Sequence, residues 1–78
     1  MIKSHSLKIS TVYFEALKRG DKTCEIRKND RLYKVGDGLL LNEFNDGKFT
    51  GRALIFDITH IDDFEQKDGF VVLSIKRA

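Results

Sequence analysis

The sequence lacks the features that mark several large protein classes. It has 78 residues with one cysteine and no proline. The single cysteine, Cys24, excludes an internal disulfide framework and a multi-cysteine zinc site, which favours a reducing compartment. No apolar run approaches the ~20 residues of a transmembrane helix. Residues 1–6 carry charge but no apolar stretch of the kind found in signal peptides. We therefore expect a cytoplasmic chain with no membrane contact.

The sequence also lacks the patterns of a metal site and of a second domain. His5, Cys24 and His60 are far apart in the sequence and lack the spacing of a zinc site. The acidic run at 62–68 lacks the spacing and internal glycine of an EF-hand. There is also no glycine-rich phosphate loop. No repeat, low-complexity tract or linker divides the chain. We expect a single domain over residues 1–78, with no metal and no cofactor.

Charge is abundant and unevenly distributed. The formal net charge is +2, but residues 1–34 contain nine Lys/Arg and four Asp/Glu, whereas residues 35–78 contain five and eight. Such asymmetry is typical of a basic face that attracts a polyanion. The alternative is a solvated surface of mixed charge, because basic residues are only the electrostatic part of a nucleic-acid signature.

The hydrophobic pattern predicts an α+β, mainly β fold. A helix is expected over 11–19, and strands over 5–9, 22–28, 39–41, 52–61 and 70–76. Asn45-Asp46-Gly47 predicts a tight hairpin turn. Short strands with one early helix suggest a small barrel or a strongly bent sheet. Closure into a barrel would also remove exposed strand edges.

Side-chain spacing gives more detailed expectations. Val12/Ala16 and Tyr13/Leu17 are i,i+4 pairs that would form one apolar stripe on the helix, and Gly20 would end the helix in a left-handed conformation. Tyr13, Phe14 and Tyr33 are candidates for stacking on bases, and one of the adjacent Tyr13 and Phe14 is expected to line a cleft. The residues expected in the core are Cys24, Phe44, Phe49, Phe56 and Phe70.

The segment from Gly20 to Arg27 is the best candidate for chemistry. Glu25 and Arg27 project from the same face of the predicted strand, about 7 Å apart, and Lys22 stands at its entrance. Lys22 and Arg27 could bind phosphate or carboxylate groups. Glu25 could orient Arg27, accept hydrogen bonds from a base or sugar, or act as a general base. The alternative is a surface ion pair worth less than ~1 kcal/mol.

Gly20-x-Lys22-x-x-Glu25-x-Arg27 resembles the GxKxxExR motif of ASCH domains, which belong to the PUA-like superfamily of RNA-associated β-barrels. The segments 5–9, 25–31 and 68–75 resemble a compact bacterial and phage subgroup of unknown function, so the resemblance covers nearly the whole chain. It implies a small PUA-like β-barrel with one helix between strands 1 and 2, and a cleft between helix and barrel. It also implies binding of RNA or a nucleotide. The residues that the resemblance assigns to the cleft are Lys22, Glu25 and Arg27, with Lys8 and Arg31 as further candidates and Gly20 as the turn.

Two other functions stay open at this point. Some ASCH-like proteins are small amidohydrolases acting on acylated cytidine, which resemble this chain at the motif lysine but use a threonine three residues later. That place is occupied here by Glu25, and Thr23 is not at the matching position. If the chain is an enzyme, Glu25 could activate a water molecule while Lys22 acts as electrophile or acid. The other alternative is a protein-interaction domain in which the motif is structural. The sequence leaves the ligand and the oligomeric state open.

Overall fold

Residues 2–78 form one helix and five strands in the predicted order. The computed structural model describes residues 2–78. The elements are β1 (Ser4–Ile9), α1 (Thr11–Arg19), β2 (Cys24–Lys28), β3 (Gly38–Asn45), β4 (Lys48–Asp62) and β5 (Phe70–Arg77). The prediction of a mainly β chain with an early helix is confirmed.

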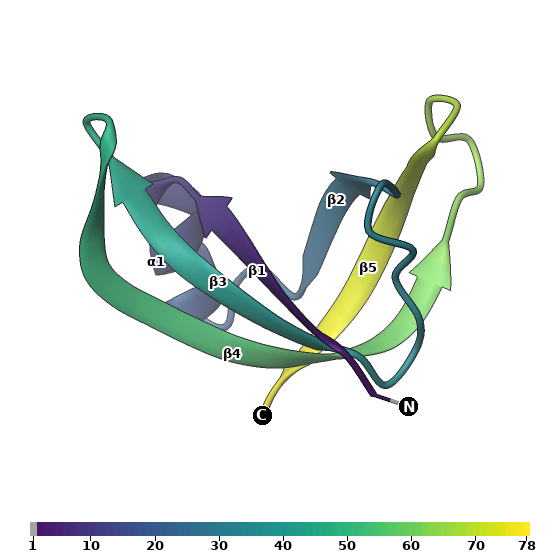
Figure 1. Cartoon of the computed structure of the whole chain (residues 1–78), viewed down its shortest axis with the longest axis horizontal. Coiled ribbons are helices and arrows are strands. Elements are labelled where there is room, and N and C mark those ends of the chain that lie inside the picture. Colours follow the sequence, from purple (N-terminus) through teal and green to yellow (C-terminus); the bar gives the residue numbers. More distant parts are fainter. Residues whose placement is uncertain (1) are drawn as a thin grey trace.

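The strands form one strongly curled sheet. Its order is β1-β3-β4-β5-β2. β1 pairs with β3 in parallel, and the other neighbours are antiparallel. β4 pairs with β3 through residues 48–57 and with β5 through residues 56–62, so this long strand passes from one arm of the sheet to the other. Figure 1 shows the resulting saddle, in which β1, β3 and the start of β4 face β2 and β5 across a gap.

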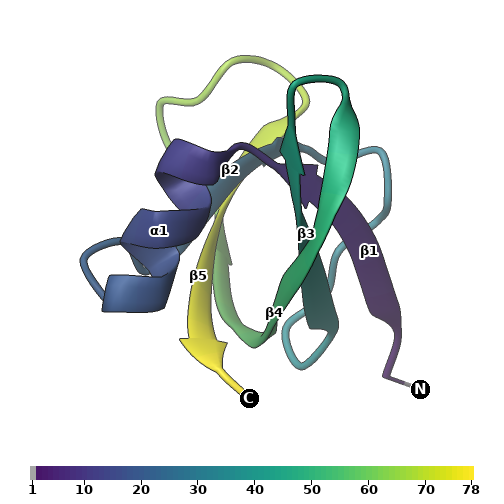
Figure 2. The ribbon, with the colours of Figure 1, turned by 90° about the vertical axis from the view of Figure 1, so that its left-hand side faces the viewer.

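The sheet is a half-barrel and not a closed barrel. β1 and β2 are its two edges, and no backbone ladder joins them within residues 2–78. α1 connects these two edge strands and lies against one side of the curl (Figure 2). The predicted bent sheet is confirmed, whereas the backbone closure that would remove its edges is absent from the described residues.

The core is formed by alternate residues of four strands, β1, β3, β4 and β5. Leu39 and Leu41 of β3 are fully buried, and so is Leu73 of β5. The other buried hydrophobic residues are Leu7, Ile9, Phe14, Leu17, Tyr33, Leu54, Phe56, Ile58, Val71 and Ile75. Because successive side chains of a strand point to opposite faces, each of these strands presents one row to this core.

The helix buries only part of the stripe that its i,i+4 pairs predict, because Leu17 is buried and Ala16 is half-buried. Phe14 and Leu17, three residues apart, are buried, whereas Val12 and Tyr13 are exposed. Ser10 occupies the N-cap position without a side-chain capping bond. Gly20 has φ +86° and ends the helix as predicted, since this left-handed conformation favours glycine.

Several aromatic and small residues expected in the core lie elsewhere. Among the phenylalanines expected there, only Phe56 is buried; Phe44 and Phe70 are half-buried, and Phe49 is exposed. Cys24 is also only half-buried. The hairpin turn itself is as predicted, with positive φ at Asp46 and Gly47. These errors share a cause: a half-barrel this small has one covered face, and residues near its edges and hairpin tip lie beyond it.

Candidate functional site

The predicted cluster is built on the end of α1 and the start of β2. The backbone N–H of Gly20 donates to Leu17 O, and the N–H of Asp21 donates to Ala16 O at 3.0 Å, so the chain leaves the helix in a fixed direction. It then enters β2 at Cys24, with Lys22 two residues earlier. Lys22 Nζ donates a 2.6 Å hydrogen bond to Cys24 O, which holds the ammonium group beside the strand.

Glu25 lies at the centre of this cluster and is only 5% exposed. Its Oε2 accepts a hydrogen bond from Arg27 Nε at 3.0 Å, and its Oε1 lies 3.4 Å from Lys22 Nζ. The three charged side chains are therefore in contact. Burial of the carboxylate excludes the alternative of a solvent-exposed ion pair. It also explains why Cys24 is not in the core as expected, because the face of β2 that carries Glu25 points inward, while Ile26 on the face of Cys24 is 56% exposed.

Arg27 and Arg31 bridge the gap between the two edges of the sheet. Arg27 Nη2 donates to the backbone oxygen of Lys8 at 2.8 Å, and Arg31 Nη1 donates to that of Ser6 at 3.1 Å. Both acceptors are carbonyl groups on β1, which an edge strand leaves without a partner strand. Side chains thus make the connection that the backbone does not, and they bring Lys8 and Arg31 to the same site as the motif.

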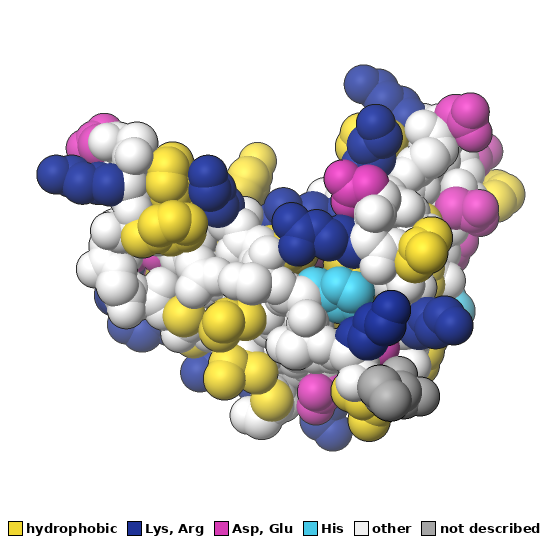
Figure 3. Space-filling model, viewed as in Figure 1, with side chains coloured by type: hydrophobic (Ala, Val, Ile, Leu, Met, Phe, Trp, Pro, Cys, Tyr) yellow, Lys and Arg dark blue, Asp and Glu magenta, His cyan; other side chains and the backbone are white. Residues whose placement is uncertain are grey.

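A cleft opens between β1, the start of α1 and β2. It has a volume of about 400 Å³ and is lined by Lys8, Ile9, Ser10, Tyr13, Lys22, Glu25, Ile26 and Arg27. A second hollow of about 320 Å³ shares Lys8 and Arg27 with the cleft and adds Arg31. Figure 3 shows Lys and Arg side chains gathered at the bottom of the notch between the two arms. All five predicted site residues, Lys8, Lys22, Glu25, Arg27 and Arg31, line one or both of these hollows.

The aromatic residues near the cleft divide into lining and core residues. Tyr13 is 56% exposed, and its ring lies 5.4 Å from Lys22 Nζ, whereas Phe14 is buried. The expectation that one of these neighbours lines a cleft is confirmed. Tyr33 is buried against His5, with ring centroids 4.8 Å apart, and burial raises the pKa of its hydroxyl. Tyr33 therefore offers no free face for stacking.

Cations outnumber the carboxylate in the cleft, which makes it suited to an anion. Lys8, Lys22 and Arg27 carry three positive charges against the single negative charge of Glu25. Within residues 2–78, Arg27 donates hydrogen bonds through Nε and Nη2 but not through Nη1, so its guanidinium keeps donors for a ligand. The cleft can therefore hold a phosphate or carboxylate group and place a planar ring beside Tyr13.

The sequence reasoning missed two buried polar clusters. His5 Nε2 lies 2.9 Å from Asp37 Oδ2, and Asp37 also accepts the backbone N–H groups of Lys3 and Lys34. The hydrogen bond from His5 is the main cause that holds the pKa of Asp37 below its ordinary value. These contacts tie the start of β1 to the turn before β3. The sequence contained a signal for this burial, because His5 lies two residues before the apolar Leu7 and therefore on the same face of the strand.

The second missed cluster joins the β3–β4 hairpin to α1. Glu43 is buried at a β-bulge and accepts hydrogen bonds from Arg52, whose Nε lies 2.8 Å from Oε1. Arg52 also contacts Glu15 of the helix at 2.6 Å. The bonds from Arg52 and, next, from Thr50 lower the pKa of Glu43 to about 2. The sequence also contained a signal for the burial of Glu43, because this residue continues the row of Leu39 and Leu41 on one face of the strand.

Replacement of Glu43 by glutamine is expected to change the acid stability of the fold. Because the pKa of Glu43 falls from 4.5 to about 2 on folding, its ionised form stabilises the protein above pH 4.5, and this contribution is lost as the pH falls toward 2. Glu43→Gln should lower the free energy of unfolding at pH 7. Between pH 4.5 and pH 2, this free energy should fall less steeply in the variant than in the parent protein. Urea unfolding measured from pH 7 to pH 3 tests this, with exposed Asp57→Asn as the control. A Glu43→Gln profile parallel to the parent profile would contradict it.

The described part of the chain contains neither a metal-binding cluster nor a membrane-spanning helix. Across residues 2–78, no group of three or more His, Cys, Asp or Glu side chains is arranged to hold a metal ion. In the same residues, no helix is both long enough and apolar enough to cross a membrane.

Sequence comparison relates the chain to a protein family and to a phage protein. Residues 4–75 match a family described as "Domain of unknown function (DUF3850)". A similar curated protein is the "Uncharacterized 12.9 kDa protein in GpA 3'region" of Escherichia phage P2, which is 43% identical over 67 residues. The match covers 82% of this chain and 62% of the phage protein, so the chain spans less than two thirds of that relative. The expected likeness to a group of unknown function with phage members agrees with both matches. The chain belongs to the DUF3850 family.

Proposed function

We propose that this chain is an ASCH-like, PUA-like domain that binds RNA or a nucleotide in the cleft between β1, α1 and β2. The observation that carries the proposal is the convergence of Lys8, Lys22 and Arg27 on one cleft beside an exposed aromatic ring. A ligand that combines an anionic group with a planar ring fits this set of side chains. Nucleotides have that combination, and the phosphate supplies much of the affinity in such complexes.

Glu25 has a positioning role in this proposal. Its buried carboxylate fixes Arg27 through two contacts at 3.0 Å and keeps Lys22 within 3.4 Å. Side chains held in this way lose less conformational entropy when a ligand binds. The two cations remain partly accessible, with side-chain exposures of 23% for Lys22 and 25% for Arg27. They can therefore contact both Glu25 and an incoming phosphate.

The geometry favours binding over hydrolysis by a threonine nucleophile. Thr23 is exposed and is not among the residues that line the cleft. A water activated by Glu25 is the remaining route to hydrolysis, and turnover of an acylated cytidine would reveal it. A protein-interaction domain with a structural motif is the other alternative, and it predicts no affinity for nucleotides.

Lys22→Met is expected to weaken ligand binding at least about tenfold, because a hydrogen bond to a charged group is worth about 1.5–3 kcal/mol. The matched control is Lys18→Met, which removes the same charge from an exposed position on α1. Nucleoside monophosphates, acylated cytidine and short RNA oligonucleotides would be screened by thermal shift, since a ligand that binds only the folded state raises its Tm. Affinities of the hits would then be measured by titration.

Salt supplies a second measurement for the same proposal. The RNA affinity of the parent protein should fall as salt rises, because binding releases counterions from the phosphates. Lys22→Met should show a shallower dependence than Lys18→Met. The proposal fails if the parent protein binds none of the probes, or if Lys22→Met and Lys18→Met bind them equally well. The Tm of each variant without ligand shows whether a loss of binding follows from unfolding.

A further inference from the structure

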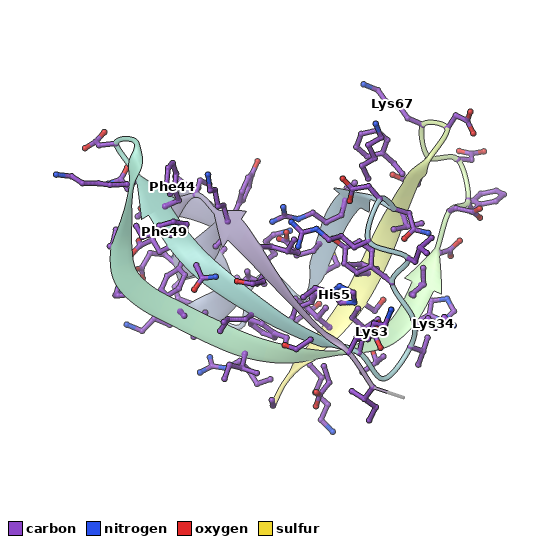
Figure 4. All side chains as sticks on the ribbon, in the orientation of Figure 1. Lys3, His5, Lys34, Phe44, Phe49 and Lys67 are labelled. Carbon is purple, nitrogen blue, oxygen red and sulfur yellow. The ribbon has the colours of Figure 1, made fainter. Side chains whose placement is uncertain are left out.

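A pair of aromatic residues, one of them exposed, lies on the hairpin beside the cleft and outside the motif. Phe44 and Phe49 are cross-strand partners of β3 and β4, with ring centroids 5.0 Å apart and planes at 76°. Phe49 is 56% exposed. Figure 4 shows both rings on the hairpin arm, facing the gap between the arms. The contact between the two rings leaves more than half of the Phe49 surface exposed, so this ring is accessible to a ligand.

Basic side chains connect this ring pair to the cleft. Lys8 lines both the cleft and the adjoining hollow, and its Nζ lies 4.4 Å from the ring centroid of Phe44 and 5.7 Å from that of Phe49. Arg27 also lines both spaces, and Arg31 lines the hollow together with Phe49. The cleft, which Tyr13 lines, and the hollow, which Phe49 lines, are therefore joined by the shared cations Lys8 and Arg27.

We infer that the ligand is a single-stranded polynucleotide that runs from the cleft to the hairpin, with a second base stacked on Phe49. This inference rests on the proposed function and deepens it. Lys8, Arg27 and Arg31 would contact the phosphates between the two bases. A ring that stacks on a base requires that base to be unpaired, so this path selects single strands over a duplex. The competing explanation is that Phe44 and Phe49 only stabilise the hairpin as a cross-strand pair.

The test compares Phe49→Leu with Phe64→Leu. Leucine keeps an apolar side chain but removes the aromatic face. Phe64 is 75% exposed in the loop after β4 and is not among the lining residues of the cleft or the hollow. The probes are uridine monophosphate, single-stranded oligouridylate, its deoxy counterpart, and an RNA duplex of the same length. The ribose and deoxyribose series identify the sugar that the path accepts.

The parent protein should bind one of the single-stranded series more tightly than the mononucleotide and more tightly than the duplex. Phe49→Leu should lose at least about fivefold of the oligonucleotide affinity, since stacking contributes about 1–3 kcal/mol per base, and should bind the mononucleotide as the parent does. A 2-aminopurine base in the oligonucleotide should be quenched on binding to the parent protein and less so by Phe49→Leu.

The outcomes separate this inference from the proposed function. If the mononucleotide binds and Phe49→Leu matches Phe64→Leu on every oligonucleotide, the path to the hairpin is wrong while the cleft assignment stands. Equal affinity for duplex and single strand would also overturn the inference. If the parent protein binds neither mononucleotide nor oligonucleotide, the proposed function itself fails.

Discussion

Arg27→Ala is expected to lower the free energy of unfolding by about 2–3 kcal/mol, because it removes charge-assisted hydrogen bonds from two partners. The buried Glu25 would keep only Lys22 at 3.4 Å, and the Lys8 carbonyl on the sheet edge would lose its 2.8 Å partner. This is a large fraction of the total stability of a small domain, which is about 5–15 kcal/mol. Urea unfolding at neutral pH measures the change.

The matched control for this variant is Arg19→Ala. Arg19 also pairs with a carboxylate, that of Asp21 at 2.9 Å, but its side chain is 58% exposed. Exposed pairs contribute less than about 1 kcal/mol. A double variant, Glu25→Gln with Arg27→Ala, should recover part of the loss because no unpaired carboxylate is left buried. If Arg27→Ala is no more destabilising than Arg19→Ala, the hydrogen bonds of Arg27 between the sheet edges do not stabilise the fold.

The largest effect is expected for Leu73→Ala, which should lower the free energy of unfolding by about 2–5 kcal/mol. Leu73 is fully buried on β5, where it pairs with Ile61 of β4 and Glu25 of β2. The truncation leaves a cavity among strands that cannot collapse freely. For a domain of this size, each 1 kcal/mol shifts the Tm by about 4–8 °C, so thermal unfolding would show the change clearly.

Ile55→Ala serves as the control for the core variant. Ile55 lies on β4 with 57% of its surface exposed, so its truncation should change stability by less than about 1 kcal/mol. Equal losses for Leu73→Ala and Ile55→Ala would mean that the buried row of β5 is not the centre of the core. The comparison also tests whether the outer face of β4 is open to solvent in the folded protein.

Local signals in the sequence were sufficient for most of the secondary structure. Residue spacing predicted the buried row of the last strand, Val71, Leu73 and Ile75. In β4 the residues on both faces are apolar, so the sequence did not indicate that only Leu54, Phe56 and Ile58 would form its buried row. Asp46-Gly47 predicted a turn that needs two positive φ values, and Gly20 predicted the helix end. These features depend on backbone conformation within a few residues, and such preferences are legible in the sequence.

The same local signals failed where burial depends on what covers a face. Val12 has the helical spacing of a core residue but is 75% exposed, because the half-barrel covers only the side of α1 that carries Phe14 and Leu17. Glu25 and Arg27 share one face of β2 as predicted, but this polar face is the one that points inward. Phe49 is exposed because it lies near the hairpin tip, beyond the covered part of the sheet.

For the candidate site, spacing predicted Glu25 and Arg27 on one face of a strand and Lys22 at the entrance of that strand. Long-range packing settled the rest, because Arg27 and Arg31 reach β1 carbonyls that lie 19 and 25 residues away in the sequence. Such contacts depend on how far the sheet curls, and that curl results from the path of β4 between its two neighbours. The residue types are therefore a local property of the chain, whereas the cleft they form is a property of the assembled sheet.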